Sequence, residues 1–261
     1  MTDYVHGYDA RANERLLDQA AALVDLLHHD TAYPAGSRVL EAGCGVGVAQ
    51  TGTLVARSPE AQFTAVDVSA ESLAQALERT RGATNVDFVQ ADIFALPFAP
   101  HAFDHVFVCF LLEHLAQPVE ALRGLAGLVR PGGTVTVIEG DHGSTYFHPD
   151  SAAAQDAIRC QVELQRRAGG DAEIGRRVYP LMVEAGVTGV RVSPRMVYVD
   201  ASRPELVDGF THRTFTAMIK GVREDALQAG LIAPERFDEG IAALSATEVF
   251  CYAFFKGVGR A

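Results

Sequence analysis

The sequence predicts an α/β fold built on a doubly wound, mostly parallel sheet, and three observations carry this prediction. Short apolar strands alternate with helical stretches from residue 36 to about 140. A glycine-rich turn directly follows the first of these strands. The segment Phe103–Phe110 is almost continuously apolar, as expected of a strand that is buried on both faces.

The composition suits one sizeable intracellular domain. The 261 residues are 48% hydrophobic, which allows a large core and a small helical addition. The net charge is −11 and the 22 Lys and Arg residues are scattered, so we expect no nucleic-acid partner on electrostatic grounds. The four cysteines have no CxxC spacing, and no apolar run reaches membrane-spanning length. We expect reduced thiols, no membrane partner and a cytoplasmic location.

The first 35 residues are expected to form a lid and a helix. Apolar residues recur at helical spacing through residues 13–29, at Leu16, Leu17, Ala20, Leu23, Val24 and Leu27. Tyr4 and Tyr8 stand in a short polar and aromatic lead-in. This lead-in fits either a lid over a bound ligand or a frayed terminus, and its density of aromatic residues favours the lid.

The first strand and its turn, Val39 to Gly47, are the centre of the pattern. A helix is expected over residues 46–57, and the second strand, Gln62–Val66, runs into Asp67 twenty residues after Gly47. A strand, a glycine turn and an acid at this distance are typical of a nucleotide pocket, in which the acid accepts hydrogen bonds from ribose hydroxyls.

The remaining elements follow from turn and cap signals. Ser69 is a good N-cap for a helix over residues 70–81. Further elements are expected in this order: strands 85–90 and 103–110, helix 118–128, a tight turn at 130–133, strand 134–139, helices 150–168 and 175–185, strands 187–192 and 195–200, a helical insertion over 204–246, and strand 249–257.

The turn also bears on which nucleotide is bound. A dinucleotide fingerprint starting at Gly43 needs a glycine at position 48, which is valine. A nicotinamide-dependent oxidoreductase is therefore the weaker alternative. The sequence has acidic-x-G-x-G-x-G instead, opened by Glu41. In this it resembles the class I S-adenosylmethionine-dependent methyltransferases, and within them the small-molecule enzymes of types 11 and 25.

The resemblance implies a Rossmann-like sheet of seven strands whose last two strands form an antiparallel edge. It implies a cofactor-binding domain over residues 36–261, with substrate-covering helical insertions at about 143–180 and 203–247. The implied cofactor is S-adenosyl-L-methionine, and the implied product is S-adenosyl-L-homocysteine.

Ligands of such sheets bind at the carboxyl ends of the strands. Asp67 is expected to hold the ribose and Asp92 the adenine amino group, with Ile93 packed on the ring; a helix cap and a loop aspartate are the plainer alternatives. The expected cofactor residues are Tyr4, Glu41, Gly43, Cys44, Gly45, Asp67, Val68, Asp92, Ile93 and Cys109.

The fourth strand end, Cys109 to Leu115, resembles the same segment of small-molecule methyltransferases. The N/D-P-P-Y/F pattern of many nucleic-acid and protein N-methyltransferases is missing. Positions 109 and 110 are Cys and Phe, where catechol-type enzymes hold magnesium, so we expect no metal. Glu113 and His114 are expected to be structural.

The fifth strand end is the expected substrate side. His142 is the candidate base, because histidine titrates near neutral pH, and Asp141 is the candidate group that orients it. A polar loop without catalytic function is the alternative. Tyr8, Glu139, Tyr146 and Tyr179 are the expected substrate-binding residues.

These inferences predict methyl transfer to a small, apolar or aromatic metabolite of secondary metabolism. The favoured reaction is C- or N-methylation of an electron-rich ring such as an indole, with O-methylation as the alternative. A non-catalytic adenosylmethionine-binding protein is the alternative from another class. The sequence leaves a monomer and a homodimer open.

Overall fold

The computed structural model describes residues 23–47 and 50–261. Seven strands form one sheet in the order β3-β2-β1-β4-β5-β7-β6. The strands are β1 (Arg38–Ala42), β2 (Gln62–Asp67), β3 (Val86–Gln90), β4 (Phe103–Cys109), β5 (Val129–His148), β6 (Thr188–Val199) and β7 (Val249–Arg260). The strands β1 to β5 pair in parallel, and β7 pairs antiparallel with both β5 and β6. The predicted doubly wound, Rossmann-like sheet is confirmed.

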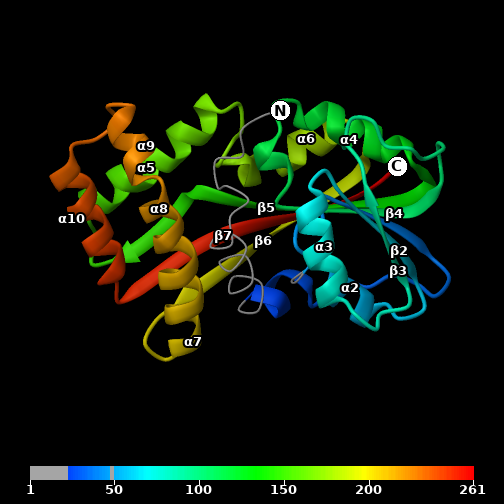
Figure 1. Cartoon of the computed structure of the whole chain (residues 1–261), viewed down its shortest axis with the longest axis horizontal. Coiled ribbons are helices and arrows are strands. Elements are labelled where there is room, and N and C mark those ends of the chain that lie inside the picture. Colours follow the sequence, from blue (N-terminus) through cyan, green and yellow to red (C-terminus); the bar gives the residue numbers. More distant parts are fainter. Residues whose placement is uncertain (1–22, 48–49) are drawn as a thin grey trace.

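Helices cover both faces of this sheet (Figure 1). In the first half they are α2 (Thr51–Arg57), α3 (Ala70–Arg79), the short 3₁₀ helix η1 (Leu112–His114) and α4 (Pro118–Gly127). In the second half they are α5 (Ala152–Arg167), η2 (Ile174–Arg177), α6 (Val178–Glu184), α7 (Pro204–Leu206), the π-helix η3 (Val207–Thr216), α8 (Ala217–Gly221), α9 (Arg223–Gln228) and α10 (Pro234–Ser245). Figure 1 shows α7 to α10 at the end of the molecule away from β2 and β3.

Strand β5 is much longer than expected. The predicted tight turn at 130–133 and the predicted loop after Glu139 are both part of this strand, which pairs with β7 as far as His148. The register shifts between Asp141 and Tyr146, as at a β-bulge. Pairing with β7 satisfies the backbone groups of this polar segment, so its loop-like composition misled the prediction.

Two other boundaries differ from the prediction. Helix α2 begins at Thr51 rather than at residue 46, because the glycine turn continues to Gly47. The two strands expected at 187–192 and 195–200 are one strand, β6. Pro194 lies within it, which is possible because β6 is the edge of the sheet and needs no N–H donor on its open side.

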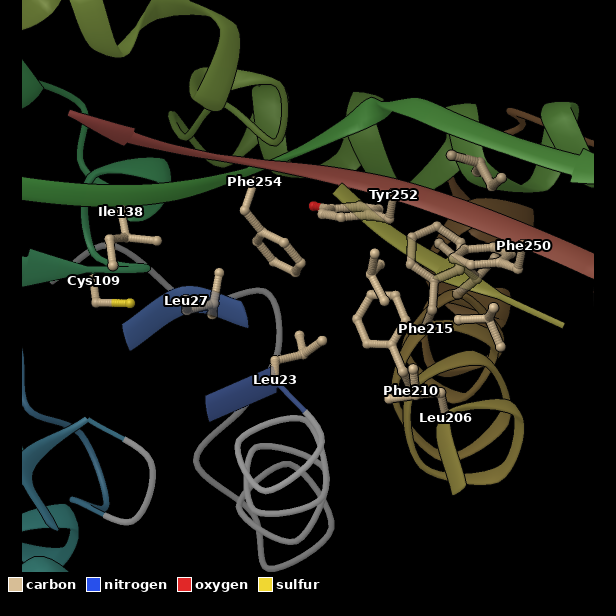
Figure 2. Close-up of a cluster of buried hydrophobic side chains, with 14 of the residues drawn as sticks. Leu23, Leu27, Cys109, Ile138, Leu206, Phe210, Phe215, Phe250, Tyr252 and Phe254 are labelled. Atoms are coloured by element: carbon tan, nitrogen blue, oxygen red, sulfur yellow. The ribbon is translucent and has the colours of Figure 1, made fainter. Parts of the chain in front are cut away.

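The core has two parts. One contains Val106, Val135, Leu122 and Leu125 together with Val178 and Met182 of α6. The other is rich in aromatic side chains: Phe210 and Phe215 of η3 and Phe250, Tyr252 and Phe254 of β7 gather close to Leu23 and Leu27 (Figure 2). Residues 23–28 are helical, so the first described helix closes the aromatic part of the core.

A cluster of charged side chains connects the end of this first helix to β6 and β7. Asp30 accepts hydrogen bonds from Lys256 Nζ at 2.6 Å and Arg195 Nη2 at 2.5 Å, and Thr31 Oγ1 lies 2.6 Å from the same ammonium. Burial opposes ionisation of Asp30, but the two cations outweigh it and lower the pKa of the carboxyl. Lys256 is only 3% exposed, so this single carboxylate stabilises a cation in the interior.

No helix within residues 23–47 and 50–261 is both long and apolar enough to cross a membrane.

Candidate active site

The turn after β1 is shaped by three glycines with positive φ. Gly43, Gly45 and Gly47 have φ angles of 72°, 53° and 71°, a region that favours glycine. A Cβ on Gly43 would lie 2.9 Å from the Leu111 side chain, and one on Gly47 would lie 2.5 Å from Ala76 Cβ. A Cβ on Gly45 would meet nothing within 4 Å. The turn is therefore closed on the protein side at Gly43 and Gly47 and open at Gly45, where a ligand can approach the backbone.

Asp67 ties the ends of β1 and β2 together. Its Oδ2 accepts from the Gly45 N–H at 2.8 Å, and its Oδ1 accepts from the Ser69 N–H at 2.9 Å, where helix α3 begins. An ionised carboxylate has about four acceptor positions, so two remain for hydroxyl groups. The neighbouring Val68 side chain is 58% exposed. A fixed acceptor beside an exposed apolar side chain fits a nucleoside.

The end of β3 offers a similar combination. Asp92 is exposed, and its Oδ1 accepts from the Phe94 N–H at 2.9 Å. Ile93 is half-buried and Phe94 is 50% exposed. Gln90 Nε2 donates to the Val68 carbonyl at 3.0 Å and so links the two loops. A purine needs apolar surfaces and a polar anchor, and this edge supplies both.

Glu41 lies beneath the turn and is almost completely buried. It is 2% exposed, and its Oε2 has no hydrogen-bond partner among the described residues. Burial raises the pKa of Glu41 to about 8; the Thr51 hydroxyl acts against this rise, and the charge of Asp67 adds to it. An unpaired buried carboxyl oxygen fits the ammonium group in the methionine part of S-adenosylmethionine.

The two cysteines predicted at the cofactor site are buried and neutral. Cys109 accepts from Gln50 Nε2 at 3.5 Å, and Cys44 Sγ donates to the Gly45 carbonyl at 3.7 Å. Burial raises the pKa of both thiols. They can therefore pack against a ligand but are not nucleophiles at neutral pH.

At the end of β4 the chain turns with a non-glycine residue in the left-handed region. Phe110 has a φ of 54°, which is uncommon for an aromatic residue. The turn is held by Glu139, whose Oε1 accepts from the Leu111 and Leu112 N–H groups at 3.1 and 2.8 Å. Glu139 is fully buried. We expected Glu139 to bind the substrate. In the structure it is buried and anchors the backbone at the start of η1.

His142 is buried beside β7. Its Nδ1 shares a hydrogen bond of 3.0 Å with the Tyr252 hydroxyl, and its Nε2 lies 3.4 Å from Met218 Sδ. The Phe215 ring is 6.0 Å from the imidazole between centroids. Burial lowers the pKa of His142, while the charges of Glu113 and Asp141 act in the opposite direction. The lowered pKa favours the neutral imidazole, which is the form that a base needs.

We predicted that Asp141 orients His142, but the structure pairs Asp141 with Arg176 instead. Adjacent residues of a strand point to opposite faces of the sheet, and Asp141 binds Arg176 on the other face, with its two oxygens 2.7 and 2.8 Å from Nε and Nη2. The partner that orients His142 is Tyr252, which sequence analysis assigned only to a strand. The two residues are 110 positions apart, so no local signal connects them.

Glu113 and His114 lie close to this histidine. Glu113 Oε2 accepts from Gln165 Nε2 at 3.1 Å, and its Oε1 is 3.6 Å from His114 Nε2. Burial raises the pKa of Glu113, and His142 opposes this rise. Burial also lowers the pKa of His114 to about 4. Glu113 joins η1 to α5, which agrees with the structural role expected for it.

The other predicted substrate residues are not brought to His142. Tyr146 pairs with Cys251, so it lies on the face opposite to that of Tyr252, and it is 64% exposed. Tyr179 belongs to α6 and is 55% exposed, while its neighbour Val178 is buried against the sheet. Tyr4 and Tyr8 lie outside the described residues.

Comparisons with known proteins identify a methyltransferase domain in the chain. Residues 40–137 match the family model described as "Methyltransferase domain". A 37.1 kDa uncharacterised transposon protein of Streptomyces fradiae is 32% identical over 189 residues, which cover 71% of this chain and 54% of that protein. Methyltransferase GfsG of Streptomyces halstedii is 30% identical over 144 residues, which cover 53% of this chain and 51% of that protein. The chain thus spans about half the length of these curated relatives.

Among solved structures, phosphoethanolamine N-methyltransferase 2 of Haemonchus contortus matches with a TM-score of 0.55 and 18% identity, over 94% of this chain and 53% of that one. That enzyme was solved with phosphomonomethylethanolamine and S-adenosylhomocysteine. At this identity the match shows the fold. Residues 40–137, which hold the glycine turn and the acids at the ends of β1 to β3, therefore match a methyltransferase domain, and the fold is that of the class I S-adenosylmethionine-dependent methyltransferases.

Proposed function

We propose that the protein transfers the methyl group of S-adenosylmethionine to a small, apolar, aromatic metabolite in the cytoplasm. The observation that carries this proposal is the buried pair of His142 and Tyr252, surrounded by the rings of Phe215, Phe210 and Phe254. His142 lies in the part of β5 that continues past the end of β4, and Tyr252 lies on the neighbouring strand β7. The pair therefore adjoins the sheet edge where the glycine turn, Asp67 and Asp92 are fitted for the cofactor.

The acceptor is proposed to be uncharged. No Lys or Arg of the described chain is among the groups that shift the pKa of His142 or Tyr252. A phosphate or carboxylate close to this pair would be buried without a cation, at a cost of several kcal/mol. The site therefore differs from what a ligand such as the phosphomonomethylethanolamine of the Haemonchus contortus enzyme requires. An electron-rich ring such as an indole, methylated on carbon or nitrogen, fits these surroundings.

The chain's own contribution to such a reaction is to hold the acceptor and take its proton. When bound, the cofactor supplies an electrophilic methyl group, which is transferred as the bond to sulfur breaks. In the tautomer in which His142 Nδ1 donates to the Tyr252 oxygen, Nε2 carries the lone pair and faces Met218 Sδ at 3.4 Å, which the acceptor has to displace to reach it. Nε2 then accepts the ring proton that the acceptor loses. The aromatic side chains exclude water and fix the plane of the acceptor, and this positioning supplies much of the rate.

The acceptor is best identified by incubating the protein with a metabolite extract and an isotopically labelled methyl donor. A labelled product of aromatic, uncharged structure is expected, and its mass and NMR spectrum distinguish methylation on carbon or nitrogen from methylation on oxygen. Tight cofactor binding without any labelled product would contradict the proposal and favour a non-catalytic binding protein.

His142 can then be tested with the identified acceptor. His142→Ala should lower kcat by roughly 10² to 10⁴-fold, as for the loss of a general base, with little change in the affinity for S-adenosylhomocysteine. Tyr252→Phe keeps the ring but loses the hydroxyl, so it should lower kcat less and move the acidic limb of the pH profile. If kcat of His142→Ala equals that of the parent, the histidine has no part in the mechanism.

A further inference from the structure

The buried carboxyl group of Glu41 has no charged partner in the described part of the chain. None of the ion pairs there includes it, and its Oε2 accepts no hydrogen bond. The Thr51 hydroxyl acts on this carboxyl and lowers its pKa, but it does not outweigh the effect of burial. An unpaired carboxyl oxygen buried under an open glycine turn is costly, and it indicates a place where a ligand completes the hydrogen bonding.

Among the described residues, Asp67 supplies the one charge that acts on Glu41, and this charge discourages its ionisation. Asp67 from the end of β2 raises the pKa of Glu41. The charge of an ionised Glu41 would in turn raise the pKa of three neighbouring groups: Cys44 of the turn, Cys109 of β4 and Tyr33 before β1. No Lys, Arg or His is among the groups that act on Glu41 in the described chain. The free protein therefore keeps this carboxyl protonated at neutral pH.

We propose that Glu41 is a proton-coupled part of the cofactor site: it loses its proton when the ammonium group of the cofactor's methionine portion binds, and the protein releases that proton to the solvent. An ammonium ion beside a buried carboxyl favours the carboxylate, since an opposite charge stabilises the ionised form. The proton balance is simple. Neutral Glu41 and the ammonium become an ion pair, no bond between heavy atoms changes, and buffer takes up the proton. This inference rests on the cofactor of the proposed function but not on the identity of the acceptor.

The coupling makes cofactor affinity depend on pH. With a pKa of about 8 in the free protein, Glu41 is about nine-tenths protonated at pH 7, and an α-amino group is still mostly an ammonium at that pH. Binding at pH 7 should then release about 0.9 proton, and the dissociation constant should fall nearly tenfold between pH 6 and pH 7. A carboxylate that is already ionised would release no proton and give an affinity independent of pH in this range.

Calorimetry with S-adenosylhomocysteine measures this directly. Titrations in two buffers of different ionisation enthalpy, phosphate and imidazole, give the number of protons released for each ligand bound. The parent protein should release close to one proton at pH 6 and about 0.9 at pH 7. Glu41→Gln should release none, and its affinity should no longer change between pH 6 and pH 7. Methylthioadenosine, which keeps the nucleoside but lacks the amino acid portion, should release no proton from the parent.

A matched variant separates this effect from a general loss of binding. Asp92→Asn alters the exposed carboxylate at the other end of the site, so it should weaken affinity and leave the proton count unchanged. If the parent binds S-adenosylhomocysteine without releasing a proton, or if Glu41→Gln releases as many protons as the parent, the inference is wrong while the proposed function stands. If the ligand does not bind at all, both fail.

Discussion

Position 47 requires a residue without a side chain, both for packing and for backbone conformation. Its φ of 71° costs about 1 kcal/mol or more for other residues, and a Cβ would lie 2.5 Å from Ala76 Cβ in α3. Gly45 has a similar φ of 53° but open space where its Cβ would be. A substitution at Gly45 therefore tests backbone strain alone, whereas one at Gly47 adds a steric clash with Ala76.

We expect Gly47→Ala to lower the free energy of unfolding by about 2 to 4 kcal/mol, because overpacking adds to the backbone strain. Gly45→Ala should cost only about 1 kcal/mol. Urea unfolding without cofactor measures both values. Equal losses in the two variants would show that α3 moves aside and that the contact with Ala76 is unimportant.

The pairing of His142 with Tyr252 is the residue-scale feature that the sequence hid. A histidine after a strand could be recognised as a candidate base, and Asp141 beside it suggested the usual acidic partner. The pleat of β5 turns that carboxylate toward Arg176 and turns the imidazole toward β7. Gly140 contributes to this arrangement, because a Cβ there would lie 2.4 Å from the Tyr252 oxygen.

At the scale of elements, close contact between α10 and α5 depends on a glycine. A Cβ on Gly240 would lie 2.5 Å from the Ala153 carbonyl oxygen, which is backbone and cannot move aside without moving α5. Gly124 in α4 has no heavy atom within 4 Å of the same position, and it is exposed. Both positions are helical, but only position 240 lacks room for a side chain.

Gly240→Ala is expected to destabilise the protein by about 1 to 3 kcal/mol through overpacking. Gly124→Ala should stabilise it by up to about 1 kcal/mol, because alanine has the higher helix propensity. Thermal or urea unfolding of the two variants tests the contrast. A stabilising Gly240→Ala would mean that α10 does not pack on α5 at this distance.

The long antiparallel pairing of β5 and β7 decides where the helical insertions lie. It carries the sheet beyond the ends of β1 to β4, so η3 and the first described helix meet over Phe250, Tyr252 and Phe254 (Figure 2). The sequence predicted a final strand from residue 249 and a helical insertion before it. It did not predict the length of β5, because alternating small and polar residues resemble a loop until a partner strand is known.

For the molecule as a whole, buried ionisable groups set the response to pH. Burial lowers the pKa of both His28 and His114 to about 4, from about 6.5 in the unfolded chain. Above about pH 7.5 these residues are almost fully deprotonated in both states. As the pH falls from 6.5 toward 4, the unfolded chain binds protons that the folded chain does not, so stability is lost. Glu41 acts in the opposite sense, because its raised pKa makes stability fall as the pH rises from about 4.5 toward 8.

His28 offers a direct test of this whole-molecule effect. It is 1% exposed, packs against Phe107 and leaves its Nδ1 without a partner among the described residues, so leucine can replace it with little loss of polar contacts. On going from pH 7.5 to pH 5, His28→Leu should gain about 2 kcal/mol of stability relative to the parent. Urea unfolding at both pH values gives this difference. A difference close to zero would show that the parent's His28 is protonated in the folded state at pH 5.

The sequence by itself determined the order of strands and helices through residue 140, the glycine turn and the acids that follow β1, β2 and β3. These are local signals, since periodicity, turn residues and motif spacing lie within short stretches of chain. The tertiary structure alone decided the partners: Tyr252 with His142, Arg176 with Asp141, Glu139 with the backbone of η1, and the isolation of Glu41. Each of these depends on which face of a strand a side chain takes and on contacts between residues far apart in the chain, and neither is written in the local pattern.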